Sequence, residues 1–106
     1  MLFRSGIDAL AGATQLIVDT FAQNPNAVAA VSVPYLKLWG IVAGGWLMAR
    51  AAVIAAAEAG GDAEFCATKI ATARFYAEHV LPQAVALAEE VTQGAASVLA
   101  LDAARF

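Results

Sequence analysis

The 106-residue chain has few charged residues, one cysteine and one histidine. Charged residues make up 14% of the sequence, against about a quarter in an average globular domain, and Lys and Arg together number only 6. So few cations, with a net charge of −3, exclude the clustered basic surface that nucleic acid binding needs. The lone Cys66 excludes an internal disulfide, and the lone His79 excludes a metal site of several histidines.

Signals for secretion and for catalysis are also missing. No cationic segment with an apolar stretch and a cleavage site opens the chain, so we expect a cytoplasmic protein. Glu89-Glu90 has no partner at metal-ligand spacing, and Gly44-Gly45 lies inside a helical pattern, which excludes a phosphate loop. Cys66 and His79 would lie about 20 Å apart on a continuous helix, too far for a thiolate–imidazolium pair. We therefore predict no catalytic, cofactor-binding or metal-binding residue in this chain.

Apolar residues, by contrast, are abundant. They make up 61% of the chain, whose mean hydropathy is +0.69, and much of the excess is alanine. Alanine is the best helix former and has a small side chain, so close helix packing is favoured. A chain of this length with so few charges is expected to place part of its apolar surface against another domain or subunit.

The stretch YLKLWGIVAGGWLMARAA, residues 35–52, raises the question of a membrane span. Lys37 and Arg50 bracket about a dozen uncharged residues, or about 18 Å of helix, whereas a span must cross about 30 Å. The small-xxx-small pattern of Gly40 and Gly44 occurs in membrane helix pairs but allows close approach in any core. We expect no membrane span, with a membrane-associated helix pair as the less favoured alternative.

Helical periodicity runs through the whole chain, and no alternating strand pattern occurs. The sequence predicts an all-α fold, an antiparallel three-to-four-helix bundle whose third helix is kinked at Pro82. The expected segments are a helix over 7–23, a break at 24–26, a short turn over 27–33, a helix over 34–59 ended by Gly60-Gly61, and a third helix to 93. Ser32 and Asp62 are the expected caps.

The second of these helices is apolar on opposite sides, which predicts that it is sandwiched between neighbours. The larger side chains on one face, including both tryptophans, are expected to be core residues, and the glycines on the other to allow close backbone approach. On the third helix Arg74 and Glu78 have the spacing of an ion pair. The predicted helix-packing residues are Tyr35, Trp39, Gly40, Gly44, Gly45, Trp46, Phe65 and Tyr76.

Two runs carry a family resemblance: VPYLKLWGIVAGGWLMARAA and ATKIATARFYAEHVLPQAVALAEEVTQGAASVLALD. Together they resemble the C-terminal end of bacterial acyl-CoA dehydrogenases, in particular the large type similar to 3-methylmercaptopropionyl-CoA dehydrogenase. The resemblance is carried by the order and spacing of short motifs such as Pro34-Tyr35-Leu36, Gly44-Gly45-Trp46 and Ala73-Arg74-Phe75-Tyr76. It extends over most of the chain from Ile7 onward.

The resemblance implies a parent enzyme in which FAD oxidises the α–β bond of an acyl-CoA thioester and a glutamate removes the α-proton. It places that glutamate and most of the flavin and CoA contacts in an upstream catalytic core. No glutamate of this chain matches the catalytic one, so we carry over no catalytic residue. The implied role is structural: a domain, inactive alone, that covers the core and helps to form a homo-oligomer, with acyl-CoA and FAD bound only by the parent.

The first residues, MLFRS, do not fit the family pattern. We expect residues 1–6 to be a non-native leader and residues 7–106 to form a single helical domain, the C-terminal domain of an enzyme that continues upstream. An alternative from another class is a stand-alone helical interaction module that dimerises through the face of Gly40 and Gly44.

Overall fold

The computed structural model describes residues 2–57 and 61–101. Within these residues the chain is helical and contains no β-strand, so the predicted all-α class is confirmed. The elements, in chain order, are α1 Leu2–Phe21, α2 Pro25–Ala30, α3 Ser32–Ala57, α4 Ala63–Phe75, the π-helical turn η1 Tyr76–Val80, α5 Gln83–Gln93 and α6 Ala95–Leu99.

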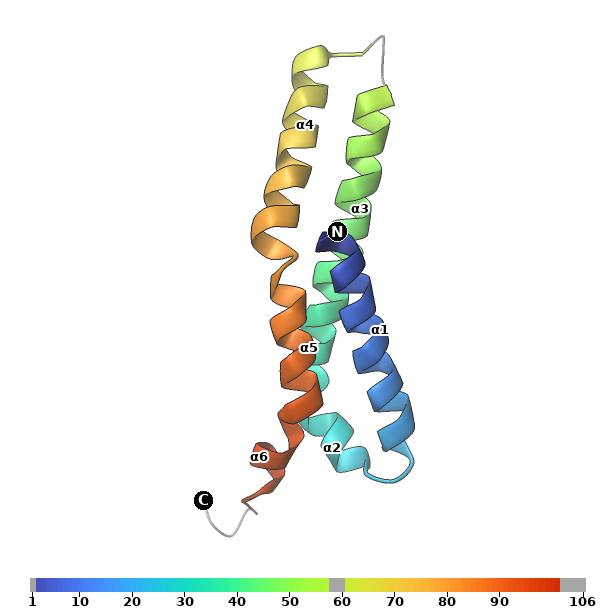
Figure 1. Ribbon diagram of the computed structural model, residues 1–106, viewed down its shortest axis with the longest axis vertical. Helices are drawn as coiled ribbons and strands as arrows, with labels where there is room; N and C mark the ends of the chain where they lie inside the picture. Colours follow the sequence, from blue (N-terminus) through green and yellow to red (C-terminus); the bar gives the residue numbers. More distant parts are fainter. Residues whose placement is uncertain (1, 58–60, 102–106) are drawn as a thin grey trace.

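The long helices lie side by side along a molecule of 64 × 27 × 17 Å (Figure 1). α3 runs antiparallel to α1 and to the rod that α4 and α5 form together. α1 begins beside the middle of α3, so the lower half of the molecule in Figure 1 has three packed rods. The upper half has only α3 and α4, which we call the α3–α4 arm. Two helices alone cannot enclose a core, so buried side chains are expected in the lower half, where three rods pack.

The hydrophobic core lies in the lower half, where α1, α3 and α5 meet. Leu38 of α3 is fully buried there, and burial of a leucine contributes about 1.5–3 kcal/mol. By contrast α4 has no buried residue. The buried apolar residues are Leu10, Ala13, Val31, Leu38, Val42, Leu81, Ala84 and Val91.

Two side chains start helices as their residue types favour. The Asn24 side chain accepts a hydrogen bond from the Ala27 amide at 3.2 Å, and Pro25 occupies the first turn of α2. Asp62, the predicted cap, accepts from the amides of Glu64 and Phe65 at 3.0 and 3.1 Å and begins α4. The cap predicted at Ser32 is wrong, because its hydroxyl instead donates back to the Ala29 carbonyl.

The first predicted helix begins earlier than expected, and the expected end of the second is not tested. The structure extends α1 back to Leu2, so residues 2–6 form its first turns, and Gly6 is buried. α3 ends at Ala57 in the described residues, and the helix end expected at Ala59 and Gly60 lies outside them.

The third predicted helix is divided into α4, η1 and α5. In η1 the Leu81 amide donates to the carbonyl of Tyr76, five residues back, at 2.9 Å, and Pro82 follows directly. Such a turn inserts an extra residue into the helix. The predicted Arg74–Glu78 ion pair is wrong: in the described part of the chain, the pair within 4.0 Å joins Arg4 to Asp8.

Candidate functional site

No cluster of reactive side chains occurs in the described residues. None of their His, Cys, Asp and Glu side chains gathers in a group of three that could hold a metal. Their buried side-chain nitrogen and oxygen atoms also all have hydrogen-bond partners. Function must therefore be sought in surfaces and packing contacts, beginning with the residues that the sequence singled out.

Three of those residues meet where α3 contacts η1. The Tyr76 hydroxyl donates to the carbonyl oxygen of Ile41 at 2.7 Å, and its ring lies against Gly44 and Gly45. A Cβ atom at Gly44 would overlap that hydroxyl, and one at Gly45 would lie 3.0 Å from a methyl group of Leu81. Burial raises the pKa of Tyr76 above its ordinary value of 10.0. The two glycines thus let the tyrosine approach the backbone of α3.

A second contact joins α3 to α1 through a chain of hydrogen bonds. The Thr14 hydroxyl donates to the Leu10 carbonyl at 2.8 Å, which leaves its oxygen to accept from Tyr35 at 2.7 Å. The Tyr35 hydroxyl in turn accepts from the Trp39 indole nitrogen at 2.8 Å. Tyr35 is half-buried and packs against the core, whereas the Trp39 side chain is exposed.

The remaining predicted packing residues are not covered within this chain. Trp39 and Trp46 are 48% and 49% exposed and Phe65 is 60% exposed, so the expected burial of the tryptophans in this chain's core is wrong. A Cβ atom at Gly40 would meet nothing within 4 Å. The physical reason is the arrangement of rods: α1, α4 and α5 contact one side of α3 and leave the other side open.

The open side of α3, which we call the outer α3 face, is almost entirely apolar. Arg50 is the charged residue among its large side chains, and its guanidinium lies 5.1 Å from the centre of the Trp46 ring. Among the described helices, α3 is also the one that is long and apolar enough to cross a membrane. Of its most apolar 18-residue stretch, 11% is buried. The large exposed side chains of this face are Val33, Leu36, Trp39, Trp46, Leu47, Val53 and Ile54.

An apolar groove, the α3–α4 groove, lies on the arm above the first turn of α1. Met48, Ala49 and Ala52 of α3 form one wall, Ile70 and Ala73 of α4 the other, and Phe3 of α1 the lower end. Its volume is about 250 Å³. This groove was not predicted from the sequence, although alanines at the spacing of one helix face were a visible signal for it.

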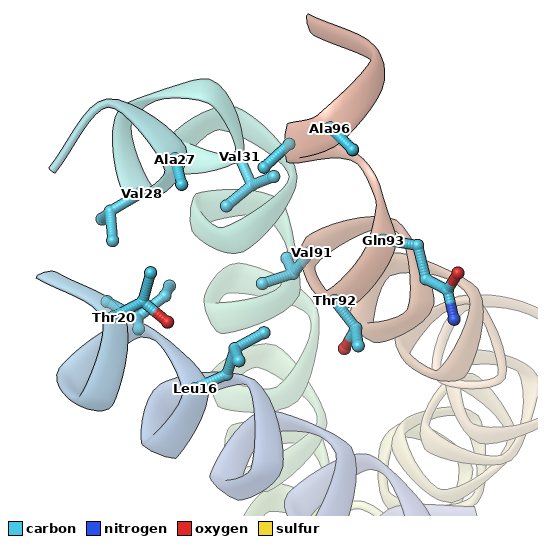
Figure 2. Close-up of a pocket in the computed structure, with 11 residues that line it drawn as sticks. Leu16, Thr20, Ala27, Val28, Val31, Val91, Thr92, Gln93 and Ala96 are labelled. Atoms are coloured by element: carbon cyan, nitrogen blue, oxygen red, sulfur yellow. The ribbon is translucent and has the colours of Figure 1, made fainter. Parts of the chain in front are cut away.

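A further cavity of about 260 Å³ lies at the opposite end of the molecule, between α1, α2, α5 and α6. Figure 2 shows Leu16 of α1, Val28 of α2, Val31 directly after α2 and Val91 of α5 lining it. The Thr92 hydroxyl donates to the carbonyl of Ala88 in its own helix, so it is already satisfied. The cavity is lined mostly by apolar side chains, with Thr20 and Gln93 as its other polar residues.

Comparison with known proteins assigns the chain to a family. A family model described as "Acetyl-CoA dehydrogenase C-terminal like" matches residues 2–102, and the chain belongs to this family. Over 99 residues the chain is 41% identical to 3-methylmercaptopropionyl-CoA dehydrogenase of Ruegeria pomeroyi. The match covers 92% of this chain and 16% of that enzyme, so the chain spans about a sixth of the relative's length. No solved structure matches the chain.

Proposed function

We propose that this chain is the structural C-terminal domain of an FAD-dependent acyl-CoA dehydrogenase, which covers the upstream catalytic core and supports its oligomer. The observation that carries this proposal is the family match over residues 2–102 combined with coverage of only 16% of the curated relative. The parent is proposed to be a cytoplasmic enzyme that oxidises the α–β bond of an acyl-CoA thioester. The domain alone is proposed to be inactive.

The residues that the structure describes do not fit a flavin site. Both cavities described above are lined mostly by apolar side chains, with Thr20, Thr92 and Gln93 as the polar residues of one and Arg74 and Tyr76 as those of the other. FAD and acyl-CoA are therefore assigned to the upstream core, and no reaction step is attributed to residues of this chain.

The exposed apolar surface supports a role as a covered domain. The outer α3 face carries seven large apolar side chains that this chain leaves uncovered, and surfaces of this kind mark contacts with other protein. A lipid environment fits less well, because α4 packs along the upper half of α3 and brings Glu64, Lys69 and Arg74 to the same depth.

The proposal is tested in the Ruegeria pomeroyi enzyme by deleting the region that matches this chain. We expect loss of soluble, flavin-loaded enzyme, and recovery when residues 2–101 of this chain replace the deleted region. The matched control is the same replacement with Leu38→Asp, which places a charge at a fully buried position and should not restore the enzyme. A deleted enzyme that keeps its flavin, activity and oligomeric state would contradict the proposal.

The outer α3 face also favours a second candidate, a stand-alone module that dimerises. The face proposed from sequence needs correction, since Gly44 is occupied by Tyr76 and only Gly40 remains open to a partner. Sedimentation of the purified chain separates the two candidates. A tight dimer that dissociates on Gly40→Leu supports the module, whereas a monomer supports the detached domain.

A further inference from the structure

The face of α3 that α1 covers continues beyond the first turn of α1. Within the covered part, a Cβ atom at Gly6 would lie 3.5 Å from Val42, and one at Gly45 would lie 3.4 Å from the Phe3 ring. Moving toward the start of α1 therefore means moving up α3. Four and seven residues after Gly45 on the same helix face are Ala49 and Ala52, which line the α3–α4 groove.

The groove has the form of an interface from which one helix is missing. Its α3 wall has two alanines, Ala49 and Ala52, beside Met48, and the alanines allow close approach of a helix backbone, as Gly45 does for Phe3. Ile70 on the α4 wall is 36% exposed, and Arg74, one turn further along α4, also lines the groove. Figure 1 shows the N-terminal end of α1 beside the middle of α3 and directed toward the space where α3 and α4 run side by side.

We infer that in the full-length dehydrogenase the α3–α4 groove is filled by the segment that directly precedes Leu2, as an upstream continuation of helix α1. Two observations select this occupant: the groove continues an interface that α1 already makes, and the family match leaves most of the parent chain upstream of this region. α3 runs twelve residues from Gly45 to Ala57, so about twelve added residues at 1.5 Å each would reach its end. The inference rests on the proposed function, because it needs an upstream chain.

The test is thiol labelling at the groove in the chimeric full-length enzyme that carries residues 2–101 of this chain. The variant is Ala52→Cys in a Cys66→Ser background, and the matched control is Ala71→Cys, an exposed alanine of α4 outside the groove. We expect Ala52→Cys to react at least about tenfold more slowly in the chimera than in the isolated chain, because labelling then requires local opening. Ala71→Cys reports any general change in thiol reactivity.

The identity of the occupant is read by attaching a benzophenone photocrosslinker to Ala52→Cys and mapping the product by mass spectrometry. Crosslinks within about fifteen residues before Leu2 support the inference, at the helical rise used above. Equal labelling rates overturn it, as do crosslinks to a second copy or to a distant part of the core. Protection that grows with the concentration of the isolated chain also overturns it, since a second copy would then be the occupant.

A second measurement keeps the inference testable where the chimera does not fold. The isolated chain is extended at its N-terminus by the fifteen residues that precede the match in the Ruegeria pomeroyi enzyme. The extended chain should protect Ala52→Cys and unfold at a higher temperature than the chain alone, and equal values overturn the inference. A soluble, flavin-loaded chimera with unprotected Ala52→Cys would defeat the inference while leaving the proposed function intact. If the extended chain protects Ala52→Cys but the chimera does not assemble, the inference is supported and the proposed function is contradicted.

Discussion

Tyr76 lies against Gly44 so closely that a single methyl group on that glycine would overlap the tyrosine hydroxyl. The same hydroxyl donates a hydrogen bond to the Ile41 carbonyl oxygen at 2.7 Å, so the ring cannot withdraw without losing it. This contact fastens the middle of α3 to η1, at the point where the three-rod half of the molecule meets the arm.

The first prediction compares two glycines of α3. Gly44→Ala should lower the free energy of unfolding by about 1 kcal/mol, because overpacking costs about 1–3 kcal/mol and the helix propensity of alanine returns about 1. Gly40→Ala should raise it by about 0.5–1 kcal/mol, because a methyl group there meets nothing within 4 Å. Urea denaturation monitored by circular dichroism measures both values.

The control for this comparison is a Tyr76→Phe background, which removes the hydroxyl that the new methyl group would meet. In that background Gly44→Ala should cost clearly less than in the wild type, whereas the effect of Gly40→Ala should not change. Additive effects of Gly44→Ala and Tyr76→Phe would show that the close contact does not limit this site.

The second prediction concerns pH. Since burial raises the pKa of Tyr76 above 10.0, the folded chain holds this proton more tightly than the unfolded chain does. The resulting stability is fully present below about pH 10 and is lost as the pH rises through the folded-state pKa. Denaturation midpoints between about pH 8 and about pH 11 should fall less steeply in Tyr76→Phe than in the wild type. Tyr35→Phe is the control and should keep the steep fall; parallel curves for wild type and Tyr76→Phe would contradict the prediction.

How much of this structure was predictable depends on whether the signal was local. The helical class followed from periodicity and alanine content, and the start of α4 followed from Asp62, whose side chain bonds to amides two and three residues away. The π-helical turn could not be predicted, because the sequence from Phe75 to Leu81 continues an ordinary helical pattern.

The burial of Trp39 and Trp46 was predicted wrongly for a different reason. A helix that is apolar on two sides indicates that both sides meet protein, but it does not indicate whether that protein belongs to the same chain. Here one side of α3 packs against α1, α4 and α5, and the tryptophans lie on the other side. In the candidate site, Tyr76, Gly44 and Gly45 were each predicted as helix-packing residues. Their contact with one another was not predicted, because it depends on the tertiary arrangement.

The third prediction compares two leucines of α3. Leu38→Ala should lower the free energy of unfolding by about 2–5 kcal/mol, because Leu38 is fully buried in the core. Leu47→Ala should change it by less than about 0.5 kcal/mol, because Leu47 is 58% exposed on the outer α3 face. The second variant should also reduce self-association in light scattering, since it removes apolar surface. Equal losses of stability for the two variants would show that the outer α3 face is covered in the purified chain.

The fourth prediction concerns the independence of the α3–α4 arm. Asp62→Ala removes the acceptor for the amides of Glu64 and Phe65, at a cost of about 0.5–2 kcal/mol. Because α4 has no buried residue and contacts only α3 and η1 among the described elements, this loss should open α4 without opening the core. Hydrogen exchange read by mass spectrometry should therefore accelerate about 2- to 30-fold in α4 and stay unchanged in α5. Asp62→Asn, which keeps a capping oxygen, should exchange nearly as the wild type does, whereas acceleration of α4 and α5 together would show that the arm and the core unfold as one unit.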